Sequence, residues 1–138
     1  MELSDKIFDR ISELSDEGDY LLENEKLDKA LEKFQEALAL VPIPKTDWEA
    51  STWLYAAIGD SFFIKEDFEK SLDNFLNAYN CPNGIDNPYV NLKIGESYFE
   101  LEDLEKAKEF LLRTYMLVGK IIFEDEKEEY YALIEPLI

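Results

Sequence analysis

The chain has 138 residues, 46% of them hydrophobic and 14% aromatic, which is enough to bury the core of one domain. It carries 32 acidic and 14 basic side chains and no histidine, so its formal net charge is -18 and its pI is about 4.2. Nucleic acid and anionic membranes are excluded as favoured partners, because both need Lys and Arg for neutralisation. We expect a basic protein partner instead.

The expected cellular compartment is inferred from three features that the sequence lacks: a cysteine pair, a secretory signal and a membrane segment. Cys81 is the single cysteine, so no disulfide forms within the chain. Residues 1–5 contain no basic segment followed by an apolar run, as a secretory signal would. No stretch approaches the ~20 apolar residues of a membrane helix. We expect a cytoplasmic protein with no membrane segment.

Residues 3–42 predict two helices joined by a turn at 24–26. Ser4 is a candidate N-cap, and Pro42 cannot extend the second helix. Between these limits, apolar and small residues recur at the spacing of one helical face. They are Ile7, Ile11, Leu14, Gly18, Leu21 and Leu22 in the first helix, and Leu27, Ala30, Leu31, Phe34, Ala37, Leu38 and Val41 in the second. Residues 42–46 form a stiff linker.

Residues 47–81 contain the most regular pattern of the chain. It reads Tyr55-x2-Ile58-Gly59-x2-Phe62, then Ser71-x3-Phe75-x2-Ala78. This spacing predicts helices over 47–65 and 67–80, each with one buried face. Gly59 would let the second helix approach closely, so we expect the two helices to pack antiparallel. Thr46 and Glu49 have the spacing of a capping box for the first of them.

Residues 87–119 repeat the pattern less completely. Asn87 followed by Pro88 predicts a helix start, and Gly119 is a candidate C-cap. The matching positions are Ile94, Gly95, Tyr98 and Ala107. Residues 124–138 begin with acidic residues and continue with apolar ones, which predicts a final helix.

The three segments resemble tetratricopeptide repeats, whose pattern is Trp-x2-Leu-Gly-x2-Tyr followed by Ala-x3-Phe. The resemblance covers residues 8–119 and implies an all-α, right-handed α-solenoid of three antiparallel helix pairs plus a C-terminal capping helix. The single domain, 1–138, would hold repeats at 3–42, 47–81 and 87–119 and a capping helix at 124–138. Gly18 and Gly59 are 41 positions apart, against a family period of 34, so we expect the linker to carry an insertion.

In similar proteins, the first helix of each pair lines a concave groove. The residue after each pattern glycine is acidic in all three repeats, namely Asp19, Asp60 and Glu96. Aromatic residues flank them six positions before the glycine, at Trp53 and Tyr89, and four positions after it, at Phe63 and Phe99. This set predicts a groove that binds Arg or Lys side chains with apolar stems. Two alternatives stay open: the aromatic residues could belong to the core, and the acidic residues to a solvated face.

The sequence gives no support for catalysis. It has no histidine, no second cysteine and no glycine-rich phosphate loop, so we expect no catalytic residue, metal or cofactor. Some tetratricopeptide domains hold a C-terminal carboxylate with a clamp of Lys, Arg and Asn. Here only Lys93 lies at a suitable position, and the neighbouring acidic residues would repel such a ligand. We interpret Cys81 as an ordinary small residue.

Two interaction functions are consistent with this sequence. The Trp48-x-Ala50-Ser51-x-Trp53 and Ile122-Phe123-Glu124 segments resemble bacterial immunity proteins encoded beside polymorphic toxins, which implies that the chain neutralises a basic cognate toxin. The alternative is a secretion chaperone, because small acidic three-repeat chaperones hold an extended effector or translocator peptide in the groove. The sequence leaves the oligomeric state open.

Overall fold

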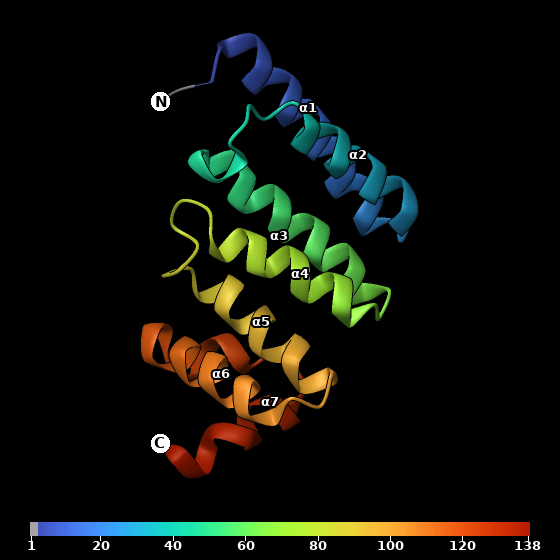
Figure 1. Ribbon diagram of the computed structural model, residues 1–138. Helices are drawn as coiled ribbons and strands as arrows, with labels where there is room; N and C mark the ends of the chain where they lie inside the picture. Colours follow the sequence, from blue (N-terminus) through green and yellow to red (C-terminus); the bar gives the residue numbers. More distant parts are fainter. Residues whose placement is uncertain (1–2) are drawn as a thin grey trace.

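The computed structural model describes residues 3–138, and within that range it is built from helices alone (Figure 1). The seven α-helices are α1 (Asp5–Glu23), α2 (Leu27–Ala39), α3 (Glu49–Ile64), α4 (Phe68–Tyr79), α5 (Pro88–Glu100), α6 (Leu104–Val118) and α7 (Glu128–Ile134). Three short 3-10 helices are η1 (Lys45–Asp47), η2 (Lys120–Phe123) and η3 (Glu135–Leu137). The predicted all-α class and the predicted number of helices are confirmed.

Consecutive helices form pairs, and the pairs stack into an elongated array. Helix α1 packs on α2, α3 on α4, and α5 on α6, while α2 contacts α3 and α4 contacts α5 between neighbouring pairs (Figure 1). The short α7 packs on α6 at the C-terminal end. A solenoid of this kind presents one continuous face made from the first helix of each pair.

Each pair is held by a close contact between a glycine and a large apolar side chain. A Cβ atom on Gly59 would lie 2.7 Å from the ring of Phe75, so only glycine allows this separation of α3 and α4. The Ser71 hydroxyl donates a hydrogen bond to the Gly59 carbonyl at 2.8 Å, which fixes the same crossing. Equivalent contacts join Gly18 to Phe34 and Gly95 to Leu111. The repeated glycine therefore sets the distance between the two helices of each pair.

The turn within each pair also repeats. Glu25, Glu66 and Glu102 each follow the end of a first helix and adopt positive φ angles of 62°, 62° and 66°. The next residue in each case donates its backbone N–H to a carbonyl of the preceding helix, as Asp67 does to Phe62 at 2.9 Å. This is the hydrogen bonding of a Schellman motif, which reverses the chain after a helix.

The helix ends agree with the predictions at three sites and differ at two. The side chains of Ser4 and Asn87 accept backbone N–H bonds as predicted N-caps, and Gly119 ends α6 with φ of 81°. The predicted capping box at Thr46 is wrong, because residues 45–47 form η1 and the N-cap of α3 is Trp48, which makes no side-chain bond. The last helix begins at Glu128, not at residue 124, because residues 124–127 are engaged in another contact described below.

Candidate protein-binding face

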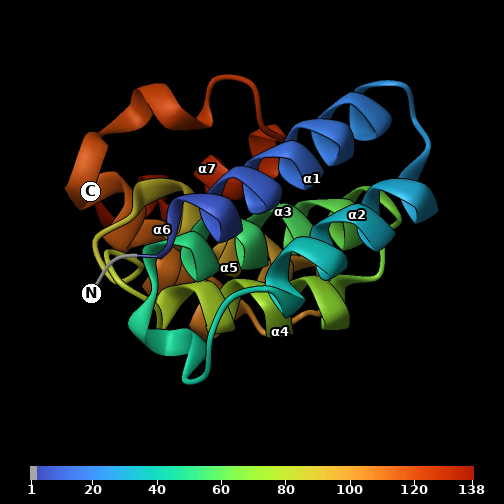
Figure 2. The same ribbon diagram turned by 90° about the horizontal axis from the view of Figure 1, so that it is seen from above.

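One face of the array is formed by α1, α3 and α5, and the chain returns to it after α6. We call residues 119–127 the strap. Figure 2 shows the strap on the side where α1 lies, opposite α2 and α4. Gly119, with its positive φ, provides the reversal that directs the chain there. The strap then reaches α5 through Glu126, whose carboxylate lies 3.0 Å from the Lys93 ammonium.

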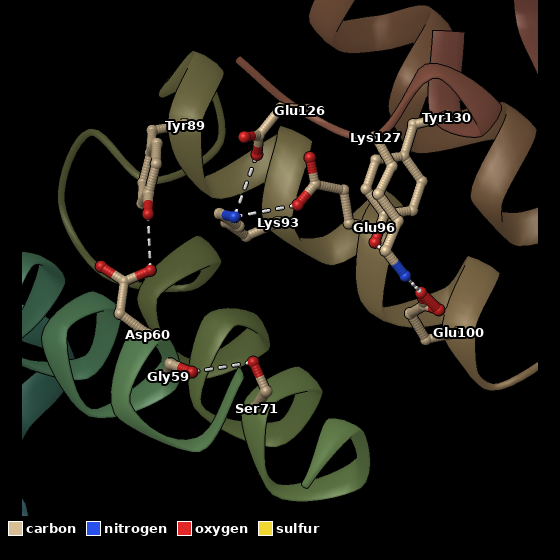
Figure 3. Close-up of polar contacts among 10 residues, drawn as sticks. All are labelled: Gly59, Asp60, Ser71, Tyr89, Lys93, Glu96, Glu100, Glu126, Lys127 and Tyr130. Carbon is tan, nitrogen blue, oxygen red and sulfur yellow. Dashed lines mark hydrogen bonds and ion pairs between the residues drawn. The ribbon is translucent and has the colours of Figure 1, made fainter. Parts of the chain in front are cut away.

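Asp60 lies near the centre of this face and is held by a tyrosine of the next repeat. The Tyr89 hydroxyl donates a hydrogen bond to Asp60 Oδ1 at 2.5 Å (Figure 3). The pKa of Asp60 is raised to about 6, mainly by burial; nearby Glu126 and Asp19 act in the same direction, while the Tyr89 bond and Lys93 oppose the shift. Within residues 3–138, Asp60 forms no ion pair with Lys or Arg. Its carboxylate is thus half-buried, held in place and lacking a cation of its own.

The first-repeat part of the face is open and acidic. Asp19 is exposed on α1, and its pKa is raised by partial burial and by the nearby Asp16 and Glu23 carboxylates. Carboxylates that raise one another's pKa share a negative potential that no neighbouring cation cancels. Asp19 also raises the pKa of Asp60, so the potential extends from α1 to α3.

The third-repeat part of the face differs from the prediction, because Glu96 is not available to a partner. Its side chain is 1% exposed, and the Lys93 ammonium lies 2.9 Å from its Oε1. Lys93 thus lies between Glu96 and Glu126 (Figure 3). The strap covers this position, which the helical spacing alone placed in an open groove.

The protonation of this cluster follows from its crowding. Burial raises the pKa of Glu96 to about 9, and the nearby Glu126 carboxylate adds to the shift, while Lys93 opposes it. The pKa of Glu126 is lowered despite partial burial, because Glu96 and Lys93 both stabilise its ionised form. The pKa of Lys93 is raised by the two carboxyl groups. The cluster therefore holds one neutral acid, one carboxylate and one ammonium.

The aromatic residues of the predicted site divide into two groups. Trp53 and Tyr89 are 39% and 40% exposed and stand at the N-terminal parts of α3 and α5. Phe63 packs edge-on against Phe68, with 5.1 Å between the two ring centres. The Lys93 ammonium lies 4.3 Å from the centre of the Phe63 ring. Phe99 packs edge-on against Tyr130 of α7 at 5.2 Å. For Phe63 and Phe99, the alternative of internal packing describes the structure better than the predicted groove contact.

The exposed aromatic residues border open hollows. Trp53 lines one hollow with Phe8 and Trp48, between the starts of α1 and α3. It lines a second hollow with Tyr89 and Val90, between the starts of α3 and α5. Asp5 and Glu49 also line the first hollow, so its lining is mixed, whereas the lining of the second hollow is mainly apolar.

Sequence reasoning missed the residues that attach the strap and α7. Lys127 pairs with Glu100 at 2.6 Å, and the Tyr130 hydroxyl donates to the same carboxylate at 3.2 Å (Figure 3). These partners are separated by 27 and 30 positions, so no local spacing signals them. The Lys93 and Glu96 pair, at i and i+3, was the one local signal available.

Among residues 3–138, no group of three or more His, Cys, Asp or Glu side chains is arranged to hold a metal ion. In the same range, no helix is long and apolar enough to cross a membrane. What the face offers is the fixed carboxylate of Asp60 and the exposed carboxylate of Asp19, with exposed aromatic rings on the same face.

These features define a tetratricopeptide-like helical repeat, and solved structures share its fold. The type III secretion chaperone SycD of Yersinia enterocolitica, in complex with a peptide of the translocator YopD, has a TM-score of 0.74 and 15% identity, covering 94% of this chain and 92% of that one. PcrH from Pseudomonas aeruginosa has a TM-score of 0.71 and 20% identity over 99% and 95% of the two chains. The Arabidopsis OM64 tetratricopeptide domain has a TM-score of 0.72 and 14% identity over 95% and 96%.

At the level of sequence, no protein-family model matches the chain, and no curated protein sequence matches it. At identities of 20% or less, the structural likeness establishes the fold alone.

Proposed function

We propose that this protein is a non-catalytic binding module that neutralises a basic cognate toxin by holding it against the α1–α3–α5 face. The observation that carries the proposal is Asp60. Its carboxylate is fixed by Tyr89 and half-buried, and no Lys or Arg within residues 3–138 pairs with it. An Arg or Lys from a partner would supply the missing charge, and a fixed acceptor gives a charge-assisted bond its best geometry.

The overall charge supports a basic partner of this kind. A net charge of -18 attracts cations over the whole surface and speeds encounter, whereas buried charged contacts slow dissociation. Asp19 extends the acidic area, and Trp53 and Tyr89 offer exposed rings to the apolar stems of Lys and Arg. A single free, buried thiol at Cys81 is compatible with action in the cytoplasm.

The test compares two charge reversals against the product of the adjacent gene, by calorimetric titration at several salt concentrations. Asp60→Lys should weaken binding by about 2 to 5 kcal/mol, because it places a cation where the partner's cation binds. Glu105→Lys, on the opposite side of the repeat in α6, is the control and should change little. Binding should also weaken with rising salt, since screening acts within ~8 Å at physiological ionic strength. Equal, negligible effects of both reversals would reject this face as the binding surface.

A second candidate is a secretion chaperone that holds an extended effector or translocator peptide. The hollows along the starts of α1, α3 and α5, which the exposed ring of Trp53 borders, favour it, and SycD, of the same fold, was solved with a translocator peptide. The two candidates differ in what they bind. A toxin domain should bind most tightly when folded, and the binding of both the folded domain and a basic segment of it should weaken as the salt concentration rises. A chaperone ligand should bind as an isolated, apolar peptide with little dependence on salt.

A further inference from the structure

The strap contributes an apolar edge to the binding face. Its far end is attached to α5 by the Glu126 and Lys93 pair, and its middle is anchored by Phe123, which is 5% exposed. Between these anchors and α6, Ile121 points outward and is 70% exposed. The strap is therefore fixed on both sides of an apolar side chain that faces solvent.

A hollow lies between this edge and the start of α5. It is lined by Asn87, Pro88, Tyr89, Val118, Ile121 and Ile122. Val118 is 42% and Tyr89 40% exposed, so the apolar lining is open to solvent. Exposed apolar side chains gathered around a hollow are typical of a surface that binds a partner.

Tyr89 connects this hollow to the acidic centre of the face. Tyr89 lines both the strap hollow and the hollow between α3 and α5, and its hydroxyl donates a hydrogen bond to Asp60. An apolar side chain bound in the strap hollow would thus lie beside the residue that holds the Asp60 carboxylate. Tyr89 is thus shared between an apolar hollow and the anionic Asp60, which together make up the two parts of the site proposed below.

We propose that the strap hollow takes an apolar side chain from the same basic partner, on a segment whose Lys or Arg reaches Asp60. This inference rests on the proposed function and adds the chemistry of the bound segment. The charge of the chain argues for that occupant: a second copy would bring another -18, and an anionic lipid surface would be repelled in the same way. A segment that combines one apolar anchor with a nearby cation satisfies both parts of the site.

The test is a selection from a displayed library of random dodecapeptides on the full chain, followed by affinity measurement with the enriched consensus peptide. We expect a consensus that contains a Lys or Arg and an apolar residue at a fixed spacing. Ile121→Ser should lower the affinity of that peptide about tenfold, because it removes most of the apolar contact. Met116→Ser is the matched control: Met116 is 82% exposed on α6, lies outside the hollow, and should leave the affinity unchanged.

The outcomes separate this inference from the proposed function. A basic consensus without a preferred apolar residue, bound equally by Ile121→Ser, overturns the strap hollow and leaves Asp60 as the binding centre. A selection without basic enrichment, or a consensus peptide unaffected by Asp60→Asn, overturns the proposed function and this inference with it. Tyr89→Phe keeps the ring and removes the bond to Asp60, so it should weaken the salt-dependent part of binding and leave the apolar preference intact.

Discussion

Replacing Glu96 by Gln should make the protein less sensitive to pH. Glu96 is fully buried, and its pKa is raised to about 9, so it is a neutral acid in the folded protein at pH 7. In the unfolded chain it ionises near its ordinary pKa of 4.5. At any pH between these two values, Glu96 must therefore take up one proton when the chain folds. Gln has the shape of the neutral acid and needs no proton.

The sign and the size of the effect follow from linkage. Because the folded pKa is raised, the contribution of Glu96 to stability is complete below pH 4.5 and is lost as pH rises toward 9. One proton corresponds to about 1.4 kcal/mol per pH unit, or about 4 kcal/mol between pH 5 and pH 8. The lowered pKa of Glu126 acts in the opposite direction, but below its ordinary value of 4.5 and therefore outside this range. The raised pKa of Asp60 affects both proteins and cancels in their difference.

The measurement is the free energy of unfolding in urea at pH 5, 6, 7 and 8, for the unmodified chain and for Glu96→Gln. As pH rises, the free energy of unfolding of the unmodified chain should fall steadily relative to that of Glu96→Gln. Glu105→Gln is the control, since its side chain is 89% exposed and loses the same charge from the folded and unfolded states. If the two stability curves of Glu96→Gln and the unmodified chain run parallel from pH 5 to pH 8, Glu96 is ionised in the fold and the account of the cluster is wrong.

Three further predictions concern the repeat itself. Gly59→Leu should destabilise the fold by about 1 to 3 kcal/mol through overpacking, and Phe75→Ala by about 3 to 5 kcal/mol through the cavity it leaves; thermally silent variants would refute the assigned contact. Glu66→Gly should raise the stability by about 1 kcal/mol in urea unfolding, because glycine adopts the observed φ of 62° without strain; a loss of stability would show that the Glu66 side chain makes an important contact. Cys81→Ser should leave partner binding intact in calorimetry and lower the stability by about 1 kcal/mol, since it buries a hydroxyl where the thiol is 5% exposed; lost binding would reveal a role for the thiol.

The repeat core could be predicted from the sequence because its contacts are local. Gly59 and Phe75 are 16 positions apart, and the pattern that places them on facing helices lies within one repeat. The same spacing in the other two repeats fixes the same contact, so one pattern accounts for three pairs. The caps at Ser4 and Asn87 could be predicted for the same reason, since an N-cap bonds only three residues ahead.

The strap could not be predicted because its contacts are distant and its composition is ambiguous. Residues 124–129 contain five acidic side chains, which is also what the first turn of a helix favours. Glu126 instead pairs with Lys93, 33 positions earlier. Local sequence patterns for helix starts do not include the ammonium of Lys93, which lies on another helix. That ammonium stabilises the Glu126 carboxylate more than a solvated helix end would.

The strap also changes which part of the acidic face a partner can use. Lys93 neutralises Glu126 while Glu96 keeps its proton, so this cluster adds no net negative charge to the face. Of the three predicted carboxylates, Asp19 and Asp60, in the first two repeats, remain to attract a cation, and Tyr89 borders Asp60. A basic segment should therefore place its cations over α1 and α3 and its apolar residues toward the strap. The strap removes one predicted anion, Glu96, from the face. It thereby makes the two ends of the face chemically different, so that a bound segment has one preferred orientation.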